Sequence, residues 1–232
     1  DSTLKYELPY FEEYDTVIYH SYYSFNYNET HEQSNWVAYE LTSDMLIKNV
    51  NRTNNFRMDP RVSTLTANNA DYRKSGYDRG HLVPAGDMSF DSIAMVESFY
   101  FSNISPQVPS FNRGIWKYLE DRVRKWAQEF EQIYVIVGPI LKPDLPSIGK
   151  NEVSVPEEFY KAILVYNDSI CKAIAFVIPN ENELGENYEK YVCTVDSLEN
   201  LINLDLFHYL DDFIEDIAES EIDYEFWGIN LN

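Results

Sequence analysis

Short apolar runs separated by polar segments follow one another along the chain, a pattern typical of β-strands in a mixed protein. These runs predict strands at Val17–His20, Tyr22–Tyr27 and Trp36–Leu41, with Asn28–Thr30 as a turn. The run Tyr134–Val137 is apolar at every position, and it ends at a Gly-Pro pair. Such a run favours a strand that is buried on both faces, in the middle of a sheet.

The second half of the chain predicts a hairpin followed by helices. Its strands are Phe159–Val165 and Ile170–Ile178, because Asn167–Ser169 between them are turn-forming residues. The elements expected after the hairpin are an acidic loop at 179–190, a last strand at Tyr191–Val195 and acidic helices across 196–218.

The middle of the chain holds a long polar connection and two short strands. Residues 48–75 carry four arginines, Arg52, Arg57, Arg61 and Arg73. A loop of this length in a compact domain is usually functional or disordered. The elements predicted next are a strand at Gly76–Pro84, helical turns across 91–98 capped by Asp91, and a second strand at Phe99–Ile104.

The clearest predicted helix runs from about Asn112 to Glu131, with Ser110 as its expected cap. Its apolar residues recur at helical spacing and predict a buried stripe, Ile115, Leu119, Val123, Trp126 and Phe130. Asn112 and Glu120 are eight residues apart, so we expect them near one line of the helix beside that stripe.

The chain has 232 residues and no internal repeat or linker, so we expect a single domain across 1–232 with a core at about 36–218. No segment approaches the ~20 apolar residues of a membrane helix, and no membrane insertion is expected. Cys171 and Cys193 are the only cysteines, and they are compatible with one bridge or with two buried thiols.

The net charge of −21 argues at first against a nucleic-acid partner, which would be repelled at long range. The distribution of charge weakens that argument. Residues 48–125 hold 12 Lys and Arg against 8 Asp and Glu, a net of +4, and the rest of the chain carries −25. The basic residues are therefore concentrated in the part of the chain that holds the candidate chemistry.

That chemistry centres on the sequence Asp78-Arg79-Gly80-His81, at the end of a predicted strand. Hydrolysis of a phosphodiester needs a base, positive charge at the phosphoryl oxygens and help for the leaving oxygen. Histidine is suited to the base, arginine to the phosphate, and Mg²⁺ prefers oxygen ligands such as the Asn112 amide. The chain has no Gly-x-Ser-x-Gly, Walker or His-Glu-x-x-His motif, which disfavours esterase, nucleotide-binding and zinc-protease functions.

Several segments together resemble the DNA/RNA non-specific endonuclease family. Asp78–His81 matches the family signature, Asn103–Gln107 is similar to its Asn-x-[Ser/Thr]-Pro-Gln, and Asn112–Trp116 with Glu120 is similar to its helix start. Weaker similarities lie at Trp36–Tyr39, Gly138-Pro139 and Thr194–Asp196, so the resemblance covers roughly 36–200. It implies an α+β, ββα-metal fold with a central, mostly antiparallel sheet flanked by helices, and DNA and RNA as substrates.

The resemblance also implies a role for each site residue. His81 would be the general base, and Asn112 would be the direct ligand of Mg²⁺, for which Mn²⁺ or another divalent ion could substitute. Glu120 would hold a metal-bound water, and Asn103 would lie near the metal or His81. The remaining implied roles are Arg79 at the scissile phosphate, Asp78 orienting the motif, and one upstream arginine, Arg52 or Arg57, at the phosphate.

Each of these residues also has a purely structural interpretation. His81 could be a core histidine, Asn112 a helix-terminal residue, and Glu120 a surface partner of Arg124. The competing function is a catalytically silent module that binds glycans or protein partners. Because the chain starts at Asp1 and a non-specific nuclease endangers its own genome, we expect an extracytoplasmic protein, secreted or periplasmic. Asn103-Ile104-Ser105 is a glycosylation sequon inside the proposed site, where a sugar would obstruct it, which favours a bacterial source. A homodimer is compatible with the sequence.

Overall fold

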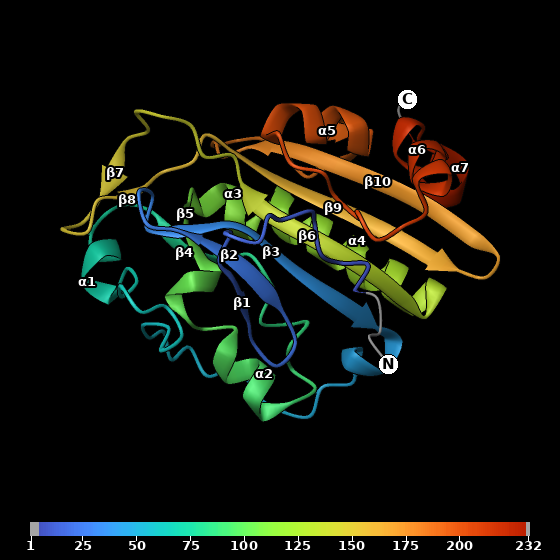
Figure 1. Ribbon diagram of the computed structural model, residues 1–232. Helices are drawn as coiled ribbons and strands as arrows, with labels where there is room; N and C mark the ends of the chain where they lie inside the picture. The colour runs from blue at the N-terminus through green and yellow to red at the C-terminus, as the bar shows by residue number, and fades with distance from the viewer. Residues whose placement is uncertain (1–4, 231–232) are drawn as a thin grey trace.

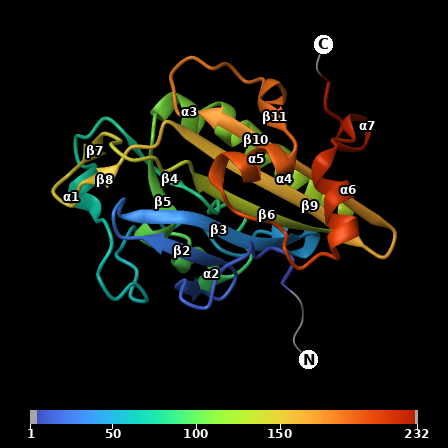
Figure 2. The same cartoon turned by 45° about the horizontal axis from the view of Figure 1, so that its top comes forward.

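The computed structural model describes residues 5–230, and a large antiparallel sheet forms its centre (Figures 1 and 2). Every pairing in this sheet is antiparallel. Within the described residues it has seven strands, in the spatial order β1 (Val17–Tyr19), β2 (Ser24–Asn28), β3 (Gln33–Thr42), β6 (Gln132–Pro139), β9 (Glu158–Asn167), β10 (Ile170–Pro179) and β11 (Val192–Cys193). The expected central strand, β6, is the middle one, and the expected hairpin is β9–β10.

Two smaller ribbons and a set of helices surround the sheet. The ribbons are β4 (Asp78–His81) with β5 (Ile104–Gln107), and β7 (Ser147–Ile148) with β8 (Val153–Ser154). The α-helices are α1 (Asn69–Tyr72), α2 (Ser92–Glu97), α3 (Pro109–Arg113), α4 (Ile115–Phe130), α5 (Val195–Ile202), α6 (Asp212–Ser220) and α7 (Tyr224–Trp227). The 3₁₀-helices are η1 (Ser43–Leu46), η2 (Phe101–Asn103) and η3 (Glu189–Tyr191).

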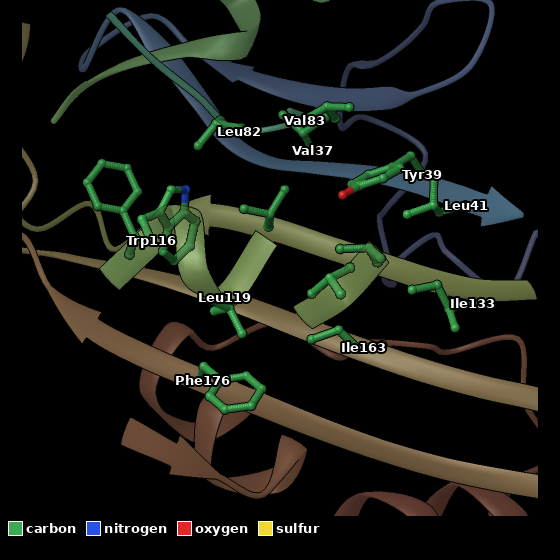
Figure 3. Packing of buried hydrophobic residues seen from close by; sticks show 14 of the residues in the cluster. Val37, Tyr39, Leu41, Leu82, Val83, Trp116, Leu119, Ile133, Ile163 and Phe176 are labelled. Atoms are coloured by element: carbon green, nitrogen blue, oxygen red, sulfur yellow. The ribbon is translucent and has the colours of Figure 1, made fainter. Parts of the chain in front are cut away.

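Both faces of the sheet are covered by helices. On one face, α4 packs its apolar stripe against inward side chains of β3, β6, β9 and β10. Figure 3 shows Trp116 and Leu119 of α4 near Ile163 and Phe176 of the sheet. Burying one such aliphatic side chain contributes about 1.5–3 kcal/mol. On the other face, α5 and α6 pack over β10 (Figure 1).

The prediction of a strand at Phe99–Ile104 was wrong in its bounds. Tyr100 precedes a 3₁₀-turn, η2, and the strand β5 begins only at Ile104 and continues through Pro106. Because β5 belongs to a two-stranded ribbon, Pro106 can lie opposite Arg79 without breaking a larger ladder. The ribbon places His81 opposite Ile104.

The prediction of one helix from Asn112 to Glu131 capped by Ser110 was also wrong. Ser110 lies inside the short helix α3, and the chain turns at Gly114 before α4 starts. A Cβ at Gly114 would overlap the carbonyl oxygen of Ser110, so this turn requires glycine. Asn112 therefore lies in the last turn of α3, Glu120 lies on α4, and the two are not on one helical line.

Four outcomes concern the rest of the chain. The last strand is only β11, because Thr194 accepts a hydrogen bond from the backbone N–H of Ser197 (3.2 Å) and starts α5. Cys171 and Cys193 are free, half-buried thiols, and they form no bridge. Asp91 caps α2 as expected. Among residues 5–230, no helix has the length and apolar character to span a membrane.

Candidate active site

A cavity of about 340 Å³ opens where β4, α3 and α4 meet the 48–75 connection. Its lining residues are Arg52, Arg79, His81, Pro84, Ala85, Gly86, Asn112, Arg113, Lys117, Glu120 and Arg124. Five of the predicted site residues therefore share one cavity, although they come from four separate segments. Asp78, Asn103 and Arg57 do not line it.

His81 ends β4, and its ring is held between aromatic side chains. The ring centroid lies 4.8 Å from Phe99, edge to face, and 5.5 Å from Phe56. The residue is 7% exposed, and its Nε2 has no hydrogen-bond partner within the described part of the chain. Burial, with Arg52 and Arg79 nearby, lowers the pKa of His81 to about 3. The imidazole is therefore neutral at pH 7 and can accept a proton.

Asn103 supports the segment that follows His81. Its Oδ1 accepts a hydrogen bond from the Val83 N–H (2.8 Å), and its Nδ2 donates to the carbonyls of Val83 and Ser98 (2.9 Å each). The side chain is fully buried, and all of these contacts are to backbone. Asn103 thus positions the backbone directly after His81, which agrees with the part of the expectation that placed it near His81.

Asp78 joins the two halves of the site. Its Oδ2 accepts from Asn112 Nδ2 and from Arg113 Nε (2.8 Å each), and its Oδ1 accepts from Arg113 Nη2 (2.6 Å). Burial alone would raise the pKa of Asp78, but the hydrogen bonds from Arg113 and Asn112 outweigh burial and lower it. Because the Asn112 amide nitrogen is bound to Asp78, its amide oxygen is the atom left for a ligand.

Glu120 is half-buried in the cavity wall on α4. Burial raises the pKa of Glu120 to about 7, against the lowering effect of the Lys161 ammonium. Among the described residues, Glu120 does not form the ion pair with Arg124 that was its structural alternative. Arg124 instead donates to Asp87 and Asp121 (2.6 Å each).

Lys161 is a functional candidate that the sequence interpretation missed. It lies in the middle of β9, fully buried, and its Nζ has no hydrogen-bond partner among residues 5–230. The ammonium is 4.9 Å from the ring centroid of Trp116, one turn before Glu120 on α4. The sequence does contain one signal for it, a single lysine within the otherwise apolar run 159–165. A lysine in such a run is expected to be buried, and a fully buried lysine without a partner is rare.

Of the two upstream arginines, the geometry favours Arg52 over Arg57 as the residue that faces the cavity. Arg52 lines the cavity with its guanidinium 5.0 Å from the centroid of Phe99, the ring that also contacts His81. Arg57 forms a backbone bridge to Tyr100 and holds its guanidinium 5.9 Å from the same residue's ring, outside the cavity lining. Arg79 stacks on Phe56 at 4.1 Å and lines the cavity.

The cavity is positive although the chain is strongly acidic. Its lining includes the cations Arg52, Arg79, Arg113, Lys117 and Arg124, and Glu120 is its only carboxylate. The oxygen donors that face it, the Asn112 amide and the Glu120 carboxylate, suit a hard divalent ion such as Mg²⁺, which retains several of its waters. The residues present therefore fit a metal-assisted reaction on an anionic substrate.

Comparisons with known proteins identify the family of this chain. The DNA/RNA non-specific endonuclease family model matches residues 4–213. A nuclease from Nostoc sp. is 32% identical over 212 residues, covering 87% of this chain and 76% of the relative. Mitochondrial nuclease EXOG from Danio rerio is 39% identical over 197 residues, covering 76% of this chain, and the chain spans 57% of that relative's length.

A solved structure shares the fold as well. The EndoG chain in the crystal structure of the EndoG/EndoGI complex superposes with a TM-score of 0.81 at 32% sequence identity, covering 90% of this chain and 91% of the other. The α+β architecture with an antiparallel sheet and flanking helices is thereby confirmed as the fold expected of a ββα-metal nuclease. The chain therefore belongs to the DNA/RNA non-specific endonuclease family, a family of nucleic-acid hydrolases.

Proposed function

We propose that this protein is a Mg²⁺-dependent, sugar-non-specific endonuclease that hydrolyses phosphodiester bonds of DNA and RNA. The observation that carries the proposal is the unpartnered Nε2 of a neutral, buried His81 in a cavity shared with Asn112 and Glu120. A neutral imidazole with an open nitrogen suits a general base that takes a proton from water.

The proton affinity of His81 depends on what occupies the cavity. Arg52 and Arg79 are among the causes of its low pKa. A bound phosphate places negative charge between these cations and the ring, so the pKa of His81 rises when substrate binds. The base therefore becomes stronger only when a phosphodiester is in place.

Arg52 and Arg79 bind the phosphate in this proposal. Each guanidinium is held against an aromatic ring, Phe99 or Phe56, before any substrate arrives. Preorganised donors that face a developing charge lose little freedom during the reaction. Arginine can also bind two phosphoryl oxygens at once, which fixes the orientation of the scissile bond.

Asn112 would hold the metal through its amide oxygen, oriented by Asp78, and Glu120 would hold it through a bound water. When bound, Mg²⁺ supplies positive charge at the phosphoryl and leaving oxygens, and Mn²⁺ or another divalent ion could take its place. Since phosphate contacts carry no base information, the same residues would act on DNA and RNA.

A nuclease assay on plasmid DNA and on RNA, with Mg²⁺ or with EDTA, tests the proposal. His81→Ala should lower the rate by about 10²–10⁴-fold while circular dichroism stays unchanged. His208→Ala is the matched control, because this exposed histidine lies outside the cavity. Full activity of His81→Ala, or equal activity in EDTA, would contradict the proposed mechanism. A folded but inactive wild type that binds a glycan array would support the silent module instead.

Three further parts of the proposal concern the whole protein. We propose that the chain acts as one catalytic domain, that it is exported from the bacterium that makes it, and that a homodimer is compatible with its activity. Cell fractionation tests the location. Light scattering coupled to size-exclusion chromatography tests the dimer, and limited proteolysis tests the single domain.

A further inference from the structure

A group of carboxylates lies on the sheet face opposite α4. Asp196 and Glu199 project from α5, and Glu219 projects from α6, the two helices that pack over β10 (Figure 1). One carboxylate oxygen from each of the three lies within 4.8 Å of the other two. The group is separate from the cavity that holds His81.

Glu219 makes this group unusual, because its side chain is buried and points into the group. The residue is 4% exposed, and its Oε1 has no hydrogen-bond partner within residues 5–230. Glu215, one turn earlier on α6, also has a buried Oε1 without a partner there. Within the described residues, Asp196, Glu199, Glu215 and Glu219 form no ion pair with a basic side chain.

The other two members keep oxygen atoms available. Glu199 uses Oε1 to accept the Leu206 N–H at 2.6 Å, and its second oxygen accepts no hydrogen bond within the described residues. Asp196 is half-buried, and its carboxylate accepts no hydrogen bond within the described residues. Each of the three side chains therefore offers at least one oxygen to a shared ligand.

Buried negative charges need compensation, since isolated charges are costly to remove from water. A proton is one form of compensation. Burial, together with Glu199, Glu215, Asp196 and Asp205, raises the pKa of Glu219 to about 10, and burial raises that of Glu199 to about 7. A cation is the other form, and it would compensate all three carboxylates together.

We propose that Asp196, Glu199 and Glu219 bind a calcium-class cation. Ca²⁺ holds oxygen ligands at roughly 2.3–2.6 Å, so ligands on opposite sides of the ion are roughly 4.6–5.2 Å apart. One oxygen from each of the three carboxylates lies within 4.8 Å of the other two, so a single ion of this kind can reach all three. All three donors are carboxylates, which Ca²⁺ prefers and which can bind it through one or both oxygens.

The cation would join α5 to α6 and so stabilise the C-terminal part of the chain. α7 follows α6, and the carbonyl of Trp227 in α7 accepts hydrogen bonds from Arg122 (2.7 Å) and Trp126 (3.2 Å) of α4. The cation is thus structural, and the nuclease activity proposed above does not depend on it.

Ca²⁺ binding to the Asn112→Ala variant tests this site, because that variant lacks the amide oxygen proposed to hold a catalytic ion. Isothermal titration calorimetry should find one Ca²⁺ per chain. The melting temperature should rise by about 3–6 °C at a Ca²⁺ concentration tenfold above half-saturation, relative to EDTA. Adding Glu219→Gln should abolish both effects, whereas adding Asp216→Asn should leave both intact. Asp216 is an exposed position of α6 outside the group, so this control makes the same acid-to-amide change away from the proposed ligands.

Two results would overturn the proposal. If Asn112→Ala binds no Ca²⁺ and Glu219→Gln raises the melting temperature in EDTA, protons alone compensate the carboxylates. If Ca²⁺ binding survives Glu219→Gln, the ion lies elsewhere. The melting curve in EDTA also shows whether the Glu219→Gln protein is folded, so loss of binding cannot be confused with loss of structure.

Discussion

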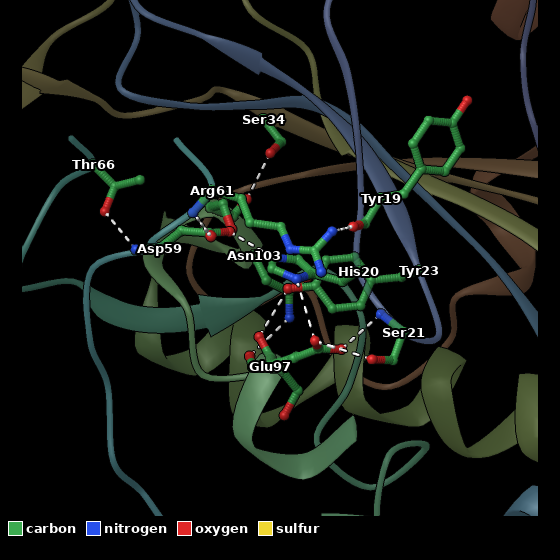
Figure 4. A network of polar contacts seen from close by, with 12 residues as sticks. Tyr19, His20, Ser21, Tyr23, Ser34, Asp59, Arg61, Thr66, Glu97 and Asn103 are labelled. Carbon is green, nitrogen blue, oxygen red and sulfur yellow. Dashed lines mark hydrogen bonds and ion pairs between the residues drawn. The ribbon is translucent and has the colours of Figure 1, made fainter. Parts of the chain in front are cut away.

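His20 lies between two buried carboxylates that hold together distant parts of the chain (Figure 4). Its Nε2 is 2.7 Å from Asp59 Oδ2 and its Nδ1 is 3.4 Å from Glu97 Oε1. Asp59 also accepts hydrogen bonds from Ser102 and from the backbone of Arg61. The group therefore links the arginine-bearing connection to η2, which directly precedes β5 of the β4–β5 ribbon.

Removing the imidazole with His20→Ala should strongly destabilise the protein. The side chains of His20 and Asp59 are 1% and 0% exposed, so solvent cannot replace the lost partner. Breaking a buried ion pair by removing one member costs about 3–5 kcal/mol. For a protein of this size, that loss corresponds to a melting temperature lower by about 6–20 °C.

The size of the loss should depend on pH. Burial lowers the pKa of His20, but its hydrogen bond with Asp59 and its ion pair with Glu97 outweigh burial and raise it. The stability from His20 is then fully present below its unfolded pKa and is lost as pH rises through the folded pKa. Asp59 and Glu97 have lowered pKa values despite burial, so their contribution is present above their unfolded pKa values and is lost in acid.

Urea unfolding of wild type and His20→Ala at pH 5.5 and pH 9 measures this difference. The destabilisation should be larger at pH 5.5, where the histidine is protonated and both carboxylates are ionised. His208→Ala is the control, and because its pair with Asp205 is exposed we expect a change within about 0.5 kcal/mol. A loss below about 1 kcal/mol, or an equal loss at both pH values, would refute the ion-pair account.

Two further predictions concern the cavity. Arg52→Ala should reduce the cleavage rate by about 10–100-fold, because a charge-assisted contact to phosphate contributes about 1.5–3 kcal/mol, whereas Arg57→Ala should change it less than about threefold; equal effects would contradict the assignment of Arg52. Lys161→Met removes a cation that lowers the pKa of Glu120, so that pKa should rise above about 7 and the acidic limb of the rate profile should move to higher pH. A one-unit rise lowers the ionised fraction at pH 7 about fivefold. Lys161→Arg keeps the charge and should retain the wild-type limb, and an unshifted limb in Lys161→Met would contradict the role of Lys161.

Elements with a local signal in the sequence were predicted well. The apolar run in β6, the turn residues of the β9–β10 hairpin and the Asp91 cap each act through neighbours in the chain, and all three are confirmed. The motif at Asp78–His81 and the spacing to Asn112 and Glu120 together indicated the family, which the family model confirms. Arg79, His81, Asn112 and Glu120 line one cavity in the structure.

The errors arose where distant contacts decide the structure. The break between α3 and α4 depends on a backbone contact at Gly114, and a glycine within a helical pattern does not by itself indicate such a turn. The strand through Pro106 exists because β4 alone pairs with it. Lys161 was missed because its relation to Trp116 and Glu120 joins β9 to α4, far apart in the sequence.

The distribution of charge reconciles an acidic protein with an anionic substrate. Exposed charges more than about 8 Å apart are largely screened at physiological ionic strength, whereas partly buried pairs are screened much less. Five cations line the cavity proposed to bind the phosphate, and most of the acidic residues lie outside the 48–125 window that supplies all five. The net charge of −21 therefore opposes the approach of nucleic acid only weakly, while the cavity determines where the phosphate binds.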